Sequence, residues 1–348
     1  WPQVIPPWRS AAPSERAKMP DLEISLGCCN YDRTRALFDG RVSVEGCRLL
    51  AVPIEPEEAF HRAFRFAEFD VSELSLSSHT LMTARGENAY VGVPAFVSRL
   101  FRHSGIYIRT DRGISSPEDL RGRTIGLPEY QITANVWIRG ILQDEFGLDP
   151  STIHWRRGGL EEPGREERAS LTLPPGIDLV QVGAGKTLSA MLEAGELDAV
   201  IGARAPSCFL NGAANVGRLF PDYPDAERRY YAKHKIFPIM HIIGVRKALA
   251  ERHPWLPVSL YKAFSAARDL AMAELAQIGH LFVSLPWPVA NFEQARSSLG
   301  DDYWSYGFAN NRHVLDVFTR YHHAQGLSKT LVRPEQLFAA STLDLSKI

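Results

Sequence analysis

The segment from Arg123 to Leu142 reads RTIGLPEYQITANVWIRGIL and joins a strand to a helix. Residues 124–127 are a short apolar run that predicts a strand, and Pro128 predicts a turn directly after it. From about Ile132 onward, the spacing of apolar side chains predicts a long helix. A strand that leads at once into a helix is part of a βαβ unit, so this segment indicates an α/β fold with mostly parallel strands.

The same alternation continues on both sides of this segment. Strands are expected at residues 22–27, 48–54, 70–76, 101–110, 152–155, 179–183, 197–206 and 237–246. Helices are expected at residues 55–66, 115–122, 187–195, 258–277 and 310–327. Residues 158–176 are rich in Gly, Pro and charge, which is typical of a long surface excursion.

The strands at 101–110 and 237–246 bracket the middle of the chain. A chain that leaves one α/β lobe, builds a second lobe and returns crosses twice between them. A cleft at such a hinge is a common place for a small ligand. We therefore predict a two-lobed fold with mixed, mostly parallel sheets flanked by helices. Its expected parts are an N-terminal tail or extension (1–20), a discontinuous first lobe (21–103 and 238–348) and a second lobe (104–237).

Composition narrows the class of partner. The 348 residues contain 39 Lys plus Arg and 40 Asp plus Glu, so no net field attracts nucleic acid or an anionic membrane. No run of about 18 apolar residues predicts a membrane span. The four cysteines show no CxxC spacing, and no secretory signal is visible before Met19, so we expect reduced thiols in a cytoplasmic protein.

Three familiar site motifs are missing from the sequence. The stretch GAGKT (183–187) resembles a phosphate loop, but Val180 stands where that motif needs glycine. No GxSxG nucleophile elbow occurs, and no histidine spacing resembles a strong zinc site. The candidate polar residues must therefore be judged by their places at strand ends.

The stretch NYDRTRAL (30–37) follows the first strand and opens a helix. An arginine fork binds both oxygens of a carboxylate, and a helix N-terminus adds N–H donors. Arg33 is therefore a candidate carboxylate ligand, and Asp32 is a candidate acid. The alternative is that Asp32 caps the helix and that Arg33 and Arg35 lie on the surface.

Two further strand ends and one strand carry polar side chains. Ser77, Ser78 and His79 follow the third strand, where they could line an anion site or simply cap a helix. Arg204 follows the strand that ends in GARAP. His241 is centred in the apolar strand FPIMHIIGV at the predicted hinge, and it is either a functional residue or a buried structural histidine.

Residues 123–142 have more polar groups at the joint between strand and helix than a helix cap needs. Capping requires one of Glu129, Gln131 and Thr133, and Tyr130 stands beside them. The helix that follows points its free N–H groups at whatever occupies the cleft. We therefore predict that this segment forms one half of a ligand site and that the NYDRTRAL stretch forms the other half.

Seven segments together resemble the 4,5-dihydroxyphthalate decarboxylase family. They are YDRTRALFDGRV, ELSLSSH, SRLFRHSGIYI, DLRGRTIGLPEYQITANVWIRGIL, LEAGELDAVIGARAP, FPIMHIIGVR and WSYGFANNRHVLDVFTRYHHAQGL. The resemblance runs from about Leu22 to Phe338. SPEDLRGRTIG and EAGELDAVIG are typical of the wider type II periplasmic-binding-protein fold, whereas YDRTRAL and PEYQITANVWIRG are more specific to the decarboxylase branch.

The resemblance implies non-oxidative loss of CO2 from a hydroxylated aromatic dicarboxylate, with 4,5-dihydroxyphthalate giving protocatechuate. An aryl carbanion is too unstable to form, so the ring carbon that bears the carboxylate must be protonated first. Such a site needs a general acid and donors for the retained carboxylate. The expected substrate-binding residues are Arg33, Ser77, Ser78, Tyr130, Gln131, Thr133 and Arg204. His241 is the first choice as general acid, and His79, Asp32 and Glu129 are its competitors.

No organic cofactor and no metal are predicted, although a divalent metal stays open because a catechol-like diol chelates metals and Asp32, Glu129 and His241 could converge on one. The expected partner is a small aromatic carboxylate, and the C-terminal helices leave surface for a homo-oligomer. The main alternative function is a solute-binding protein that captures an aromatic carboxylate for a transporter. A weaker alternative, a pyrimidine-precursor synthase of the same fold, would require a His-rich, cysteine-bearing motif that is not apparent.

Overall fold

The computed structural model describes residues 21–167 and 169–345 and is built around two β-sheets. In spatial order, the first sheet contains β2 (Cys47–Pro53), β1 (Leu22–Cys28), β3 (Val71–Ser75), β11 (Ile239–Arg246) and β4 (Tyr90–Arg99). The second sheet contains β10 (Val216–Arg218), β5 (Ile106–Arg109), β9 (Ala199–Ile201), β6 (Thr124–Leu127), β7 (His154–Arg157) and β8 (Asp178–Gln181). The expected N-terminal tail, residues 1–20, lies outside the described residues.

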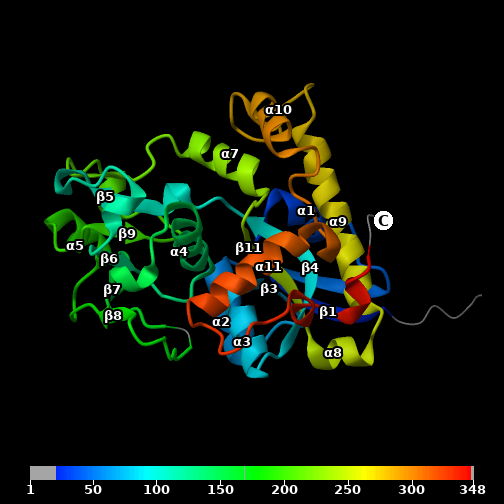
Figure 1. Ribbon diagram of the computed structural model, residues 1–348. Helices are drawn as coiled ribbons and strands as arrows, with labels where there is room; N and C mark the ends of the chain where they lie inside the picture. The colour runs from blue at the N-terminus through cyan, green and yellow to red at the C-terminus, as the bar shows by residue number, and fades with distance from the viewer. Residues whose placement is uncertain (1–20, 168, 346–348) are drawn as a thin grey trace, which may run out of the picture.

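Helices surround both sheets (Figure 1). Around the first sheet lie α1 (Asp32–Phe38), α2 (Pro56–Phe66), α3 (Leu76–Arg85), α8 (Lys247–Arg252), α9 (Leu256–Leu275), α10 (Pro288–Leu299) and α11 (Phe308–Ala324). Around the second lie α4 (Thr133–Phe146), α5 (Leu188–Ala194), α6 (Ser207–Leu210) and α7 (Tyr223–His234). Each helix ends for a local reason; α4, for example, stops where Gly147 takes a left-handed conformation (φ 62°).

The chain crosses between the sheets twice. It leaves the first sheet after Arg99 and enters the second at Ile106, and it returns between Arg218 and Ile239. The backbone N–H of Leu100 donates to the carbonyl oxygen of Pro238 at 3.1 Å, so the two crossing segments lie side by side. The expected lobe boundaries, 103/104 and 237/238, fall within these segments.

The predicted α/β architecture with two mixed sheets flanked by helices is confirmed. Strands β1, β2 and β3 pair in parallel, as do β9, β6, β7 and β8. The antiparallel pairs involve the strands next to the crossings, where β11 lies between β3 and β4, and β5 lies between β9 and β10. A strand that begins after a crossing need not run in the direction of the βαβ strands, so the antiparallel share is larger than the alternation alone suggested.

Three expected elements are shorter in the structure, and one of them is the strand predicted at 197–206, which forms only at Ala199–Ile201 (β9). The strand predicted at 101–110 begins only at Ile106, because residues 103–105 form a 3-10 turn in the crossing segment. The helix predicted at 115–122 is a 3-10 turn at Pro117–Leu120, and Gly122 then turns the chain with a φ of 71°. Strand β4, at the edge of the first sheet, was not predicted from the sequence.

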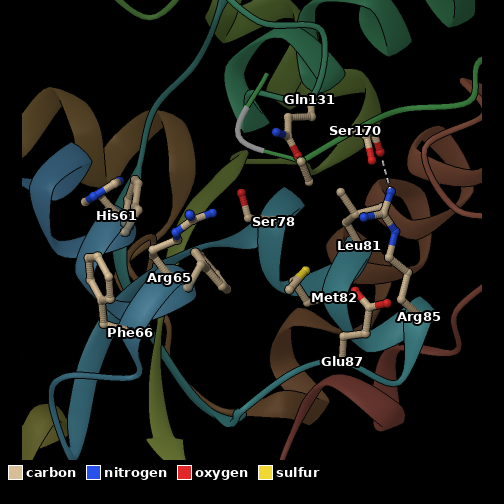
Figure 2. A pocket seen from close by; sticks show the side chains of 13 residues that line it. His61, Arg65, Phe66, Ser78, Leu81, Met82, Arg85, Glu87, Gln131 and Ser170 are labelled. Atoms are coloured by element: carbon tan, nitrogen blue, oxygen red, sulfur yellow. Dashed lines mark hydrogen bonds between the residues drawn. The ribbon is translucent and has the colours of Figure 1, made fainter. Parts of the chain in front are cut away.

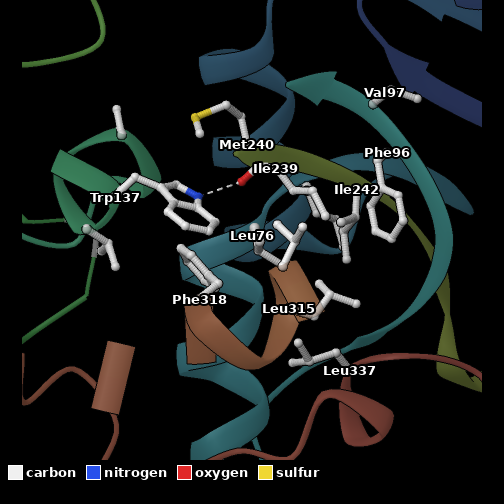
Figure 3. Packing of buried hydrophobic residues seen from close by; sticks show 14 of the residues in the cluster. Leu76, Phe96, Val97, Trp137, Ile239, Met240, Ile242, Leu315, Phe318 and Leu337 are labelled. Atoms are coloured by element: carbon white, nitrogen blue, oxygen red, sulfur yellow. Dashed lines mark hydrogen bonds between the residues drawn. The ribbon is translucent and has the colours of Figure 1, made fainter. Parts of the chain in front are cut away.

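Helix α4 is anchored against the other half of the molecule. The indole Nε1 of Trp137 donates to the carbonyl oxygen of Ile239 in β11 at 2.9 Å, and its ring packs on Phe318 of α11 (Figure 3). The guanidinium of Arg139 donates to the side-chain oxygen of Gln325 at 2.9 Å. These buried contacts hold the N-terminus of α4 in a fixed place relative to the first sheet.

Within the described part of the chain, none of the helices combines the length and the apolar character that a membrane span needs.

Candidate active site

The strand order of the first sheet places a candidate ligand-binding edge between β1 and β3. The chain leaves β1 toward β2 on one side and reaches β3 on the other, so the crevice at the carboxyl ends of β1 and β3 is a topological switch point. The segments that follow these two strands are Cys29–Tyr31 and the start of α3. Helix α4 of the second sheet meets α3 at this edge, because Thr133 hydrogen-bonds to Ser77.

A carboxylate and a histidine form the central pair of this edge. Glu73 of β3 is fully buried, and its Oε1 accepts a hydrogen bond from Nδ1 of His241 in β11 at 2.6 Å. The hydroxyl of Tyr31 donates to the same oxygen at 2.8 Å, and the backbone N–H of Cys29 donates to Oε2 at 2.9 Å. The carboxylate therefore favours a proton on Nδ1 of His241, and Nε2 is the ring nitrogen that does not contact Glu73.

The charge of Glu73 is stabilised although the group is buried. Burial alone would raise the pKa of this carboxyl, but the hydrogen bond and charge of His241 and the donors Cys29 and Tyr31 outweigh it and hold the pKa below its ordinary value. Burial, followed by the charge of Glu73, raises the pKa of the Tyr31 hydroxyl, which therefore stays protonated as a donor. Glu73 is therefore a buried anion that is held by the donors around it.

An irregularity in β4 positions the residues around His241. The register between β11 and β4 shifts on both sides of His241, and Pro94 in β4 has no N–H to give to a ladder. Carbonyl groups of this part of β4 accept hydrogen bonds from side chains outside the sheet. The carbonyl oxygen of Phe96 accepts from Trp304 Nε1 at 3.0 Å, and that of Val97 accepts from Arg33 Nε at 2.5 Å. The bulged strand thus supplies the carbonyl oxygens to which Trp304 and Arg33 hydrogen-bond.

Arg33 and Asp32, two predicted site residues, lie together beside this bulge. The guanidinium of Arg33 is stacked against the rings of Tyr31 (4.1 Å) and Trp304 (4.4 Å). Its Nη1 pairs with Asp32 at 3.0 Å, and the Asp32 carboxylate also accepts from the backbone N–H of Arg33. Arg33 is therefore held at the edge next to Tyr31, with 16% of its side chain exposed.

The N-termini of α3 and α4 meet at the cleft. The hydroxyl of Thr133 lies 3.0 Å from Ser75 Oγ and accepts from the backbone N–H of Ser77 at 3.0 Å. Ser77 Oγ is buried without a hydrogen-bond partner among the described residues, and Ser78 lies on the wall of a cavity. Thr133 therefore bridges the two helix ends, whose N–H groups and dipoles favour an anion.

Residues 128–131, called the PEYQ segment here, are held in place by contacts with the excursion at residues 158–176. The Glu129 carboxylate pairs with Arg165 at 2.7 Å. The Glu167 carboxylate accepts from the backbone N–H groups of Tyr130 and Gln131, and burial raises its pKa to about 7. Gln131 lies on a cavity wall, so the excursion fixes the turn that presents it.

Two predicted residues lie away from the Glu73–His241 pair. The Tyr130 ring is buried under the guanidinium of Arg139, 3.7 Å from its centroid. His79 is buried in α3, where Nε2 contacts the carbonyl oxygen of Leu337 at 2.8 Å and Nδ1 contacts the Asn88 amide at 2.8 Å. Burial lowers the pKa of His79 to about 4, so this ring is neutral and both of its nitrogens are occupied. We therefore leave both residues out of the proposed chemistry.

Arg204 lies at the rim of the cleft. Its side chain is 70% exposed and its guanidinium lies 3.7 Å from the Glu57 carboxylate of α2. Arg165 also pairs with Glu57, at 3.2 Å. These ion pairs join α2 to the second sheet across the mouth of a cavity of about 640 Å³.

A second cavity, of about 710 Å³, lies between α2, α3 and the PEYQ segment (Figure 2). Ser78 and Gln131 are among its lining residues, and His61 borders both cavities. Phe60 connects this cavity to the histidine, because its ring lines the wall and lies edge-on to His241 with a centroid distance of 4.8 Å. The cavity is large enough for an aromatic dicarboxylate.

The described residues contain no group of three or more His, Cys, Asp or Glu side chains arranged to hold a metal ion. The sequence had left open that Asp32, Glu129 and His241 converge on one. Their neighbours differ instead: Asp32 pairs with Arg33, Glu129 with Arg165 and His241 with Glu73.

Sequence reasoning missed Glu73, the partner of the histidine. Its signal was a single carboxylate in the middle of a strand whose five residues are all buried. A charge in such a position needs a partner. The strand that contains His241 also carries an isolated polar residue, so the two strands could have been matched from the sequence. The pairing of β3 with β11 depends on the long return of the chain, which local patterns do not reveal.

Two relatives with the same protein name align with this chain. A 4,5-dihydroxyphthalate decarboxylase from Comamonas testosteroni is 49% identical over 330 residues, which cover 95% of this chain and 100% of that protein. The chain belongs to the 4,5-dihydroxyphthalate decarboxylase family. A protein of the same name from Pseudomonas putida is 49% identical over 213 residues, covering 61% of this chain and 83% of its own length. No model of a protein family matches the chain.

Solved structures show the fold of this family member. The periplasmic aliphatic sulphonate binding protein SsuA from Escherichia coli aligns with a TM-score of 0.52 at 13% identity, covering 92% of this chain and 98% of its own. The alkanesulfonate-binding protein SsuA from Xanthomonas axonopodis pv. citri, bound to MOPS, gives the same values. The predicted periplasmic-binding-protein-like fold is therefore confirmed, and at this identity the likeness concerns the fold alone.

Proposed function

We propose that the protein is a carboxy-lyase that converts 4,5-dihydroxyphthalate to protocatechuate and CO2, with His241 as the general acid. Membership of the decarboxylase family supports the reaction, and the buried Glu73–His241 pair supports the assignment of the acid. The pair carries the proposal because it holds a protonatable nitrogen, Nε2, at the ligand-binding edge of the sheet.

The reaction begins with proton transfer from Nε2 of the His241 imidazolium to the ring carbon that bears one carboxylate. The hydroxyl para to that carbon donates electrons into the ring and loses its proton to a base or to water, which gives a dienone. The bond to the carboxylate then breaks, CO2 leaves, and the two bonding electrons restore the aromatic ring, while the para oxygen becomes a phenolate and takes its proton back from the base or from water. Glu73 stabilises the imidazolium before the transfer, and His241 takes up a new proton from solvent after it.

The departing carboxylate loses its charge, so strong pairing to it would stabilise the ground state and slow the reaction. The retained carboxylate keeps its charge and can be bound firmly. We assign it to the cavity end near Ser78 and Gln131, where the N-termini of α3 and α4 add N–H groups and favourable dipoles. Arg33 stays a proposed ligand at the Tyr31 side, and Arg204 is proposed to attract the dianion at the rim.

The test is turnover of 4,5-dihydroxyphthalate by the His241→Asn variant, with CO2 and protocatechuate measured together. We expect a loss of about 10²–10⁴-fold in kcat, the usual contribution of a general acid. A His313→Asn variant is the matched control, because His313 of α11 is exposed and its Nε2 contacts the carbonyl oxygen of His234 at 3.0 Å. Near-normal turnover by His241→Asn would refute the assignment, and binding without CO2 release by the wild type would favour a solute-binding protein.

Two further expectations belong to this proposal. The described cysteines, Cys28, Cys29, Cys47 and Cys208, are free thiols, which fits our prediction of a cytoplasmic location. Cell fractionation tests that location, and light scattering of the purified chain tests the predicted homo-oligomer.

A further inference from the structure

Helix α2 carries a cationic side chain that no part of the proposed mechanism uses. Arg65 lies in the last turn of α2 and borders the 710 Å³ cavity. It makes no ion pair and no hydrogen bond with the described residues. Its neighbour Arg62, on the same helix, pairs instead with Glu58 at 3.0 Å and with Glu68 at 3.5 Å.

The Arg65 side chain is directed into the cavity. Figure 2 shows its guanidinium extending toward Ser78 of α3, while Glu87 lies on the other side, near Met82 and Arg85. Arg85 is already engaged, because its Nη2 donates to the carbonyl oxygen of Ser170 at 2.6 Å. Arg65 is therefore the cation on this wall whose donors are available to a ligand, among the residues that the structure describes.

The surroundings of Arg65 suit a flat aromatic anion. Phe60 and Phe64, one helical turn apart on α2, face Leu81 and Met82 of α3 across the cavity. An apolar wall gives a ring something to pack on, and the guanidinium of Arg65, which is exposed at the cavity opening, can bind both oxygens of a carboxylate. Phe60 also touches His241, so a ring held on this wall has one edge near the proposed acid.

We propose that Arg65 is the specificity residue that binds the retained carboxylate and selects ortho-dicarboxylates over monocarboxylates. This inference rests on the proposed function. A dicarboxylate whose first carboxylate leaves as CO2 keeps its second as an anion through every step, so a cation there assists binding without opposing the loss of CO2. The guanidinium fork matches both oxygens of that group, and the Ser78 hydroxyl on the same wall can donate to one of them.

The test compares Arg65→Gln with Arg62→Gln, which removes the same charge from the same helix. The probe is phthalate, the substrate without its hydroxyls, which binds without reacting; benzoate serves as the monocarboxylate. We expect Arg65→Gln to weaken phthalate binding by about 10- to 30-fold and to reduce the preference for phthalate over benzoate, with Arg62→Gln within about twofold of the wild type. In turnover, KM for 4,5-dihydroxyphthalate rises similarly while kcat changes by less than about threefold.

A second variant covers the case in which Arg65→Gln fails to fold. Arg65→Lys keeps the charge but loses the fork, so its affinity for phthalate is expected between those of the wild type and Arg65→Gln. Equal phthalate affinity of the Arg65 and Arg62 variants would overturn the inference, even if the wild type releases CO2 normally. Loss of phthalate binding in Arg65→Gln, with no CO2 from the wild type on any hydroxylated phthalate, would keep the binding role and overturn the proposed reaction instead.

Discussion

The Glu73→Gln variant gives the sharpest view of the proposed acid. Glu73 accepts hydrogen bonds from His241, from Tyr31, from the Cys29 N–H and from the Cys28 thiol, and its neighbours hold it ionised although it is buried. Glutamine keeps the size of the side chain but removes the charge and one of the two acceptor oxygens. Either the Cys29 N–H then faces an amide N–H, or the amide turns and Nδ1 of His241 must give up its proton.

The expected loss follows from these contacts. Two unit charges about 4 Å apart attract each other by about 4 kcal/mol at an effective dielectric constant of about 20, and hydrogen bonds to charged groups contribute about 1.5–3 kcal/mol net. Removing the charge of Glu73 also removes the free-energy cost of burying that charge. We therefore expect the net stabilisation of the protonated imidazole to fall by about 3–4 kcal/mol. At about 1.4 kcal/mol per tenfold change, kcat falls by about 10²–10³.

The assay is the rate of CO2 release at saturating 4,5-dihydroxyphthalate, with KM and the thermal midpoint measured on the same preparations. KM should change little, because Glu73 supports the acid and not the ligand. Glu58→Gln is the matched control, since Glu58 lies on the surface of α2 and pairs with Arg62 at 3.0 Å. A folded Glu73→Gln protein that keeps more than a tenth of the wild-type kcat would refute the reasoning.

Three further outcomes are expected. First, burial lowers the pKa of His79 to about 4 and of His322 to about 3, whereas the ordinary value is about 6.5. At a pH between the folded and the unfolded pKa values, the unfolded chain therefore binds more protons than the folded chain. Their contribution to stability is complete above pH 6.5 and is lost as the pH falls toward 4, which urea melts at pH 7.5 and 5.0 would show; a flat profile would contradict it. Second, Gly140→Ala should destabilise the protein by about 2 kcal/mol or more, because the added Cβ would lie 2.2 Å from the Tyr321 ring in α11; an unchanged melting curve would exclude this packing. Third, Thr133→Val should raise KM by about tenfold with little change in kcat, because the bonds to Ser75 and Ser77 that join the two helix ends are lost; an unchanged KM would separate this contact from ligand binding.

The segment 123–142 was predictable because its signals are local. An apolar run, a proline and a helical periodicity are read within twenty consecutive positions, and β6 and α4 lie where they predict. The polar cluster at the joint was predicted to line a ligand site because a parallel strand presents its carboxyl end to the binding edge, and this role stays a prediction. What its members do there was beyond the sequence: Thr133 bridges to α3, Gln131 lines the cavity, and Tyr130 is buried under Arg139.

The sequence by itself determined the α/β class, the two crossings and, through its resemblance to relatives, the family. Local periodicity and matched segments suffice for these, because each depends on residues close together in the chain. Only the tertiary structure decided which polar residues meet. Glu73 and His241 are separated by 168 positions and join only because β11 returns beside β3. His79, with the same side chain at a similar strand end, is instead enclosed by Leu337 and Asn88 and stays neutral, because the chemistry of a buried group depends on its neighbours in space.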